Sequence, residues 1–161
     1  MAEAAMAMEM EESFESVSIK TSRFGEVTVD PEKIITMTST FPGFPESRRF
    51  TLRQHSSRSP FMWLQSLDNP DLAFVVIQAK RLVPQYQPEL PMAATRELGA
   101  GVGHELDTLL ILAIPKGKPE QMTANLLGPV MINPVTRLAK QVLLDPAKYD
   151  SCWPVFEPEQ N

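Results

Sequence analysis

The chain has 161 residues, of which 43% are hydrophobic, and a formal net charge of -5. This length fits one domain with its own core, and no stretch approaches the roughly 18 consecutive apolar residues of a membrane span. A single cysteine excludes an internal disulfide and a Cys-x-x-Cys metal site, and it favours a reducing compartment. We therefore expect a cytoplasmic protein.

The negative charge is concentrated at the N-terminus. Residues 1–16 hold five of the 20 Asp and Glu and no Lys or Arg, so 15 acidic and 15 basic residues remain in the body. A neutral body argues against direct nucleic-acid binding, which needs Lys and Arg to replace phosphate counterions. The acidic start also lacks the basic region of a secretory signal. We expect residues 1–16 to form a flexible acidic arm.

Fifteen prolines are spread along the chain and break long helices. Residues 17–21 and 25–29 alternate apolar and polar around Phe24-Gly25, which predicts a hairpin. A short strand is expected at residues 34–36. The turn at residues 41–45 contains two phenylalanines, whose rings we expect to plug one end of the core.

Three further strands are predicted in the middle of the chain. Residues 50–54 alternate, and residues 61–67 carry many apolar side chains. The turn Asp68-Asn69-Pro70-Asp71 connects the second of these to residues 72–77. That last run is continuously apolar, so we expect it to be buried on both faces.

The second half of the chain contains the best helix candidate, residues 86–99, with prolines near its start and Gly99 at its end. Residues 106–114 form the most hydrophobic predicted strand. Residues 122–127 and 130–132 form a strand pair, or one strand bent at Gly128-Pro129. Residues 138–144 are the last long strand, and residues 149–156 pack back on the body.

These short strands, regularly separated by turns, predict an all-β single domain. We expect a small antiparallel β-barrel with one or two short helices over residues 17–156, because closure removes the edges that apolar strands would expose. Residues 157–161 are expected to form a C-terminal tail.

Groups that could support catalysis are few. His104 lies near Glu105 and Asp107, and Cys152 or a serine could complete a nucleophilic set. A solvated loop histidine and a partly buried thiol are the simpler interpretations, because no basic residue lies close enough in sequence to activate Cys152. Two isolated histidines also lack metal-binding spacing.

Several segments together resemble the FliW family of flagellar assembly factors. They read IKTSRFGEVTVD from residue 19, SPFMWLQSLDNPDLAF from residue 59 and MTANLLGPVMINP from residue 122, followed by KQVLL at residues 140–144. The likeness covers roughly residues 17–153. The segment MTSTFPGF at residues 37–44 departs in its first half from the Phe-Pro-Glu-Gly-Leu-Pro-Gly-Phe of the family.

The resemblance implies a β-barrel-like protein without catalytic residues or cofactors, and two protein partners. One is flagellin, held before export. The other is CsrA, an RNA-binding translational repressor that family members bind away from its RNA surface, which relieves repression allosterically. Flagellin that accumulates would capture the FliW-like protein and free the repressor. We expect a monomer when no partner is bound.

Two other functions remain open from the residues alone. An enzyme would use His104, Asp107 or Cys152. A direct RNA-binding module would use a cluster of basic residues beside exposed aromatic rings, and the dense group in this chain is Arg48, Arg49, Arg53 and Arg58.

The candidate partner-binding residues are polar groups within apolar blocks, namely Asp68, Asn69, Asp71, Thr123 and Asn125. Asn125 is unexpected in a strand. Its side chain would either hydrogen-bond a neighbouring turn or recognise a partner.

Overall fold

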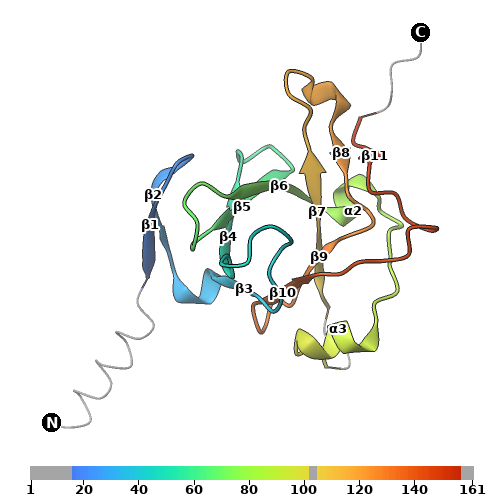
Figure 1. The fold of residues 1–161 in the computed structure, drawn as a ribbon, viewed down its shortest axis with the longest axis horizontal. Helices are drawn as coiled ribbons and strands as arrows, with labels where there is room; N and C mark the ends of the chain where they lie inside the picture. The colour runs from blue at the N-terminus through green and yellow to red at the C-terminus, as the bar shows by residue number, and fades with distance from the viewer. Residues whose placement is uncertain (1–15, 102–104, 157–161) are drawn as a thin grey trace, which may run out of the picture.

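The structure is a computed structural model that describes residues 16–101 and 105–156. These residues form short strands, two short α-helices and two 3-10 turns, and most of the regular structure is β (Figure 1). The elements are β1 (Val17–Thr21), β2 (Gly25–Val29), η1 (Pro31–Lys33), β3 (Ile35–Met37), β4 (Arg49–Gln54), β5 (Phe61–Ser66), β6 (Ala73–Gln78), α2 (Ala79–Leu82), α3 (Met92–Glu97), β7 (Asp107–Ala113), η2 (Pro119–Gln121), β8 (Thr123–Ala124), β9 (Val130–Ile132), β10 (Leu138–Gln141) and β11 (Trp153–Pro154).

Seven strands close into a barrel, which confirms the predicted fold class. Their order is β7-β6-β5-β4-β3-β10-β9, and β9 pairs back with β7. The pairing of β3 with β10 is parallel, with Leu138 opposite Thr36. The other six pairs of this ring are antiparallel, so the barrel is antiparallel as predicted except at this one pair.

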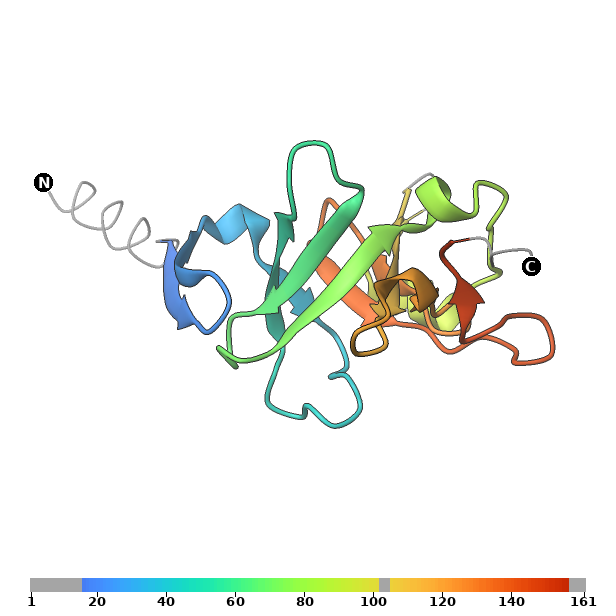
Figure 2. The ribbon, with the colours of Figure 1, turned by 90° about the horizontal axis from the view of Figure 1, so that it is seen from above.

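The β1–β2 hairpin forms a separate two-stranded sheet beside the barrel, as predicted (Figure 2). The Thr21 hydroxyl closes its turn, because it accepts from the Phe24 N–H at 2.8 Å and donates to the Gly25 carbonyl at 2.9 Å. Val27 and Val29 are buried against Leu67, which follows β5. Burial of these apolar side chains fixes the hairpin on the outer face of the barrel.

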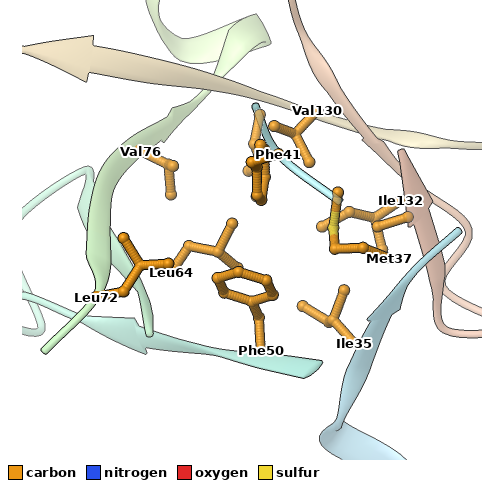
Figure 3. Close-up of a cluster of buried hydrophobic side chains, with 11 residues drawn as sticks. Ile35, Met37, Phe41, Phe50, Leu64, Leu72, Val76, Val130 and Ile132 are labelled. Carbon is orange, nitrogen blue, oxygen red and sulfur yellow. The ribbon is translucent and has the colours of Figure 1, made fainter. Parts of the chain in front are cut away.

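The barrel interior is filled by apolar side chains from most of its strands (Figure 3). Phe41 is 4% exposed, and its ring contacts those of Phe50 and Phe74 with centroids 5.5 and 4.8 Å apart. The ring of Phe44 is half-buried against Phe74. The predicted insertion of these two rings into the core is therefore confirmed. Because side chains fill the barrel interior, a binding surface must lie on the outside of the barrel.

Strands β8 and β9 are consecutive along the same edge of β7. Ala124 lies opposite Leu112, and Val130 lies opposite Leu109. Residues 125–129 bulge out between them, so the structure is nearer to the predicted single bent strand than to a strand pair, with five residues and not only Gly128-Pro129 outside the ladder. Beyond the barrel, β7, β8 and β11 form a three-stranded extension with Trp153 opposite Ala124.

The predicted helix and the last predicted strand are both shorter in the structure. The helix predicted at residues 86–99 is only α3, because Pro91 withholds a backbone donor that a helix starting at residue 86 would need. Gly99 does end it with φ of +68°. The strand predicted at 138–144 ends at Gln141, after which the chain bonds the bulge instead, through the Val142 N–H and the Pro129 carbonyl.

The burial of β6 also differs from the prediction of burial on both faces. Val76 and Ile77 are buried on opposite faces, whereas residues 73–75 are only half-buried. The short helix α2, which directly follows β6, was not predicted.

We predict that Phe41→Ala lowers the free energy of unfolding by about 3 kcal/mol, because it leaves a cavity among the core rings. Urea denaturation measures this change. Phe156→Ala is the matched control, because its side chain is 47% exposed, and it should change stability by less than about 0.5 kcal/mol. Equal effects of the two variants would contradict the described core.

Candidate partner-binding surface

The carboxylate of Asp68 organises the turn between β5 and β6. It accepts from the backbone N–H groups of Arg48 and Arg49, both at 2.8 Å. The Arg49 guanidinium donates to its other oxygen from Nε at 3.0 Å and Nη2 at 2.9 Å. Asp68 thus holds the entrance of β4 against the exit of β5, which is a structural task.

These contacts also set the ionisation of Asp68. Partial burial acts to raise its pKa, but the hydrogen bonds from Arg49 and Arg48 and the nearby guanidinium charge outweigh that effect and hold the pKa below its ordinary value. The ionised form is therefore the one that the fold stabilises.

The other polar groups of this turn bond within the molecule. The Asn69 side-chain oxygen accepts from the Asp71 N–H at 3.0 Å, an Asx-turn. The Pro70 carbonyl accepts from the Ser22 N–H at 3.0 Å, and the Asp71 carboxylate accepts from the Ser22 hydroxyl. The turn therefore connects the barrel to the tip of the β1–β2 hairpin.

Asn125 stabilises the bulge between β8 and β9. Its side-chain oxygen accepts from the N–H groups of Leu127 and Gly128 at 3.0 and 2.9 Å. The Gly128 carbonyl accepts from the Gln141 side chain at 3.1 Å. A Cβ on Gly128 would lie 2.9 Å from that Gln141 nitrogen and 3.2 Å from the Asn125 amide nitrogen, so glycine fits this crowded position. Asn125 therefore hydrogen-bonds a neighbouring turn, which is the first of the two roles predicted for it.

Thr123 differs from Asn125, because it belongs to the outward face of the extension. It lies between Ala113 and Pro154 in one cross-strand row. Ala113 and Pro154 are both exposed. Thr123 is thus part of a partly apolar surface.

The structure does not bring the two predicted segments together. The 68–71 turn is bonded to the β1–β2 hairpin, whereas Thr123 and Asn125 belong to the region of β8. Hairpin and β8 lie at opposite sides of the molecule in both views (Figures 1 and 2). A single compact site containing all five residues is therefore excluded.

Exposed large apolar side chains were largely missed by the sequence analysis. Leu143 is 75% exposed and Met92 68% exposed. Leu143 lies beside a surface hollow that is also lined by Pro91 and Tyr149, and Met92 follows Pro91 at the start of α3. The pattern did not reveal Leu143, because residues 138–144 read as a strand whose alternation would bury half of its side chains.

A second apolar group surrounds β11. Ile114, which directly follows β7, is 45% exposed, and Trp153, which begins β11, is 42% exposed. The surplus of aromatic residues was the available signal for Trp153. The apolar end surface is the name used below for Ile114 and Trp153.

Of the groups considered for catalysis, His104 lies outside the described residues, as do residues 1–15 of the predicted arm and the predicted tail. Asp107 begins β7 and is exposed. Cys152 is exposed, and its N–H donates to the Asp150 carboxylate at 2.8 Å. Across residues 16–101 and 105–156, no group of three or more His, Cys, Asp or Glu could hold a metal ion.

The basic group considered for RNA binding is divided by the structure. Arg49 is paired with Asp68, and Arg53 stacks on the ring of Phe24. In the part of the chain that the structure describes, no helix has the length and apolar character needed to cross a membrane.

The barrel and its hairpin are shared with a known protein family. The family model described as FliW protein matches residues 18–155. The chain belongs to the FliW family. This match covers the hairpin, the closed barrel and the extension.

Relatives with the name "Flagellar assembly factor FliW" agree with this assignment. The protein from Geobacter sulfurreducens is 38% identical over 141 residues, which cover 88% of this chain and 87% of that protein. The protein from Geotalea uraniireducens is 37% identical over 145 residues, covering 90% and 88%. Their names describe an assembly factor and not an enzyme.

A solved structure shares the fold. The crystal structure of the flagellar assembly factor FliW superimposes with a TM-score of 0.78 at 30% identity, covering 87% of this chain and 97% of that one. The resemblance seen in the sequence is thereby confirmed.

We predict that Asp68→Ala lowers the free energy of unfolding by about 2 kcal/mol at neutral pH, because two backbone donors and a guanidinium lose a charged acceptor. Because the pKa of Asp68 is lowered in the folded state, this stabilisation is complete above the unfolded value near 3.9. It is lost as the pH falls through the folded value.

Chemical denaturation at several pH values tests this prediction. Glu46→Ala is the matched control, because Glu46 is exposed in the neighbouring loop and, among the residues that the structure describes, forms no ion pair. The difference between Asp68→Ala and wild type should shrink in acid, while Glu46→Ala stays close to wild type. A pH-independent difference would contradict the assigned role.

We predict that Asn125→Ala destabilises the chain by about 2 kcal/mol, because the N–H groups of Leu127 and Gly128 lose their acceptor. Asn125→Asp keeps the oxygen and should retain most of the stability. Thermal unfolding of both variants measures the effect. Unchanged stability of Asn125→Ala would remove the turn-forming role and favour the recognition role instead.

Proposed function

We propose that this protein is a flagellar assembly factor that binds flagellin and antagonises the translational repressor CsrA. The observation that carries the proposal is membership of the FliW family over residues 18–155, with relatives named as flagellar assembly factors. Flagellin would be held before export, and its accumulation would release CsrA to repress further flagellin synthesis.

The filled barrel supports a role in protein binding. Its interior is occupied by core side chains, so recognition takes place on the outside. Soluble monomers bury most large apolar side chains, and contiguous exposed ones mark interaction surfaces. The apolar end surface combines an indole and a branched aliphatic side chain, and aromatic anchors of this kind dominate binding energies.

Of the five residues predicted to bind partners, Thr123 and Asp71 are the two whose side chains do not organise a turn. Thr123 lies opposite the exposed Pro154, and Asp71 is exposed and accepts one hydrogen bond, from the Ser22 hydroxyl. The oxygens of Asp68, Asn69 and Asn125 accept from the backbone N–H groups of their turns. We therefore propose Thr123 and Asp71 as contact residues, on separate surfaces.

Two separated surfaces suit a switch between two partners. If CsrA and flagellin used different surfaces, release would require coupling between them through the barrel. If they shared the apolar end surface, they would compete directly. The free protein is proposed to be a cytoplasmic monomer.

Mixing the purified chain with flagellin and, separately, with CsrA tests the function by size-exclusion chromatography. Each mixture should yield a complex, and addition of flagellin to the CsrA complex should release CsrA. Failure to form either complex would refute the proposal.

We predict that Trp153→Ser weakens the binding of at least one partner by about tenfold, because loss of an aromatic anchor costs more than about 1 kcal/mol. Isothermal calorimetry measures the affinity. Val135→Ser is the matched control, because Val135 is also apolar and 74% exposed but lies in the turn between β9 and β10. Equal affinities for Trp153→Ser and wild type with both partners would exclude the apolar end surface.

A further inference from the structure

Two rings and two guanidinium groups form a ladder where the β1–β2 hairpin contacts the barrel. The Arg23 Cζ lies 4.3 Å from the centre of the Trp63 ring, and the Arg53 Cζ lies 4.8 Å from that of Phe24. The rings themselves meet edge to face, with centroids 5.9 Å apart at 73°. The ladder joins the hairpin tip to β4 and β5, whose Arg53 and Trp63 are cross-strand partners.

Stacking orders these guanidinium groups but leaves their edges free. A guanidinium over a ring is held by the ring quadrupole, while its five N–H donors point outward in the plane of the group. Within the described residues, ion pairs form between Arg49 and Asp68 and between Lys140 and Glu97, and none involves Arg23 or Arg53. Both side chains are exposed.

Two carboxylates in or beside the hairpin have other residues as their partner or register neighbour. Asp71 accepts from Ser22, the residue before Arg23. Glu26 lies opposite Lys20 in the β1–β2 register. The ladder therefore holds two ordered guanidinium groups that form no ion pair with an acidic side chain among the described residues. The planar guanidinium group can bind a carboxylate through two parallel hydrogen bonds.

We propose that this ladder, Arg23 with Trp63 and Phe24 with Arg53, is a docking site for an acidic segment of a partner protein. Each guanidinium would pair with one carboxylate of that segment. The proposal goes beyond the proposed function, because it assigns a surface on the other side of the molecule from the apolar end surface. It also specifies that the segment of the partner that docks here is acidic.

The geometry favours a peptide over RNA. Single-stranded RNA binds by stacking its bases on open ring faces, together with many phosphate contacts. Here the rings of Trp63 and Phe24 are already stacked by Arg23 and Arg53. The ladder supplies charged edges and few free ring faces, which suits carboxylates.

Binding of fluorescein-labelled hexaglutamate at low ionic strength, followed by fluorescence polarisation, tests the site. Arg23→Gln and Arg53→Gln should each weaken binding by about tenfold. Arg53→Lys keeps the charge without the planar fork and should give an intermediate loss. Arg96→Gln is the matched control, because Arg96 is exposed on α3 without an ion-pair partner, and it should bind like wild type.

Thermal unfolding checks that each variant is folded. If Arg23→Gln destabilises the hairpin, the comparison of Arg53→Gln with Arg53→Lys decides the test. The proposal is overturned if wild type fails to bind hexaglutamate or if all variants bind equally. It is also overturned if a hexauridylate probe binds more tightly than hexaglutamate with the same dependence on Arg23 and Arg53. Loss of hexaglutamate binding with intact flagellin and CsrA complexes would separate this site from the proposed function.

Discussion

The barrel closes because β7 is hydrogen-bonded along both of its edges. One edge pairs with β6, with Val76 opposite Ile111, and the other pairs first with β9 and then with β8. Its side chains alternate between the barrel core, through Leu109, and the outer cluster, through Leu110 and Leu112. One strand therefore supports the core, the closure and the extension at the same time.

This arrangement separates two surfaces of different chemistry. The hairpin side presents Arg23 and Arg53 on aromatic rings, whereas the extension presents Ile114 and Trp153. Between them stands a core of close-packed side chains, and such interiors are barely compressible and transmit strain. Coupling of the two surfaces would therefore require an element of the barrel that has two discrete arrangements, whereas partners that share one surface would compete without it.

Local sequence patterns predicted most of the strands, because glycine, proline and side-chain alternation act within a few residues. Gly25 and the run from Val17 predict the hairpin for this reason. The parallel pairing of Leu138 with Thr36 joins segments about 100 residues apart and has no local signature. Local sequence likewise predicted the turn that begins at Asp68. It could not predict the hydrogen bonds from Arg48 and Arg49 to Asp68, because these residues meet only in the folded chain.

The short strand β11 ends the sheet in a way that bears on solubility. The Val155 N–H donates to the Met122 carbonyl, so alternate positions of this segment face outward. Of these, Pro154 has no N–H, and the Cys152 N–H is taken by Asp150. Free strand edges recruit further strands and lead to aggregation. At Cys152 and Pro154, this edge therefore offers no donor to an added strand, next to apolar side chains that the surface exposes.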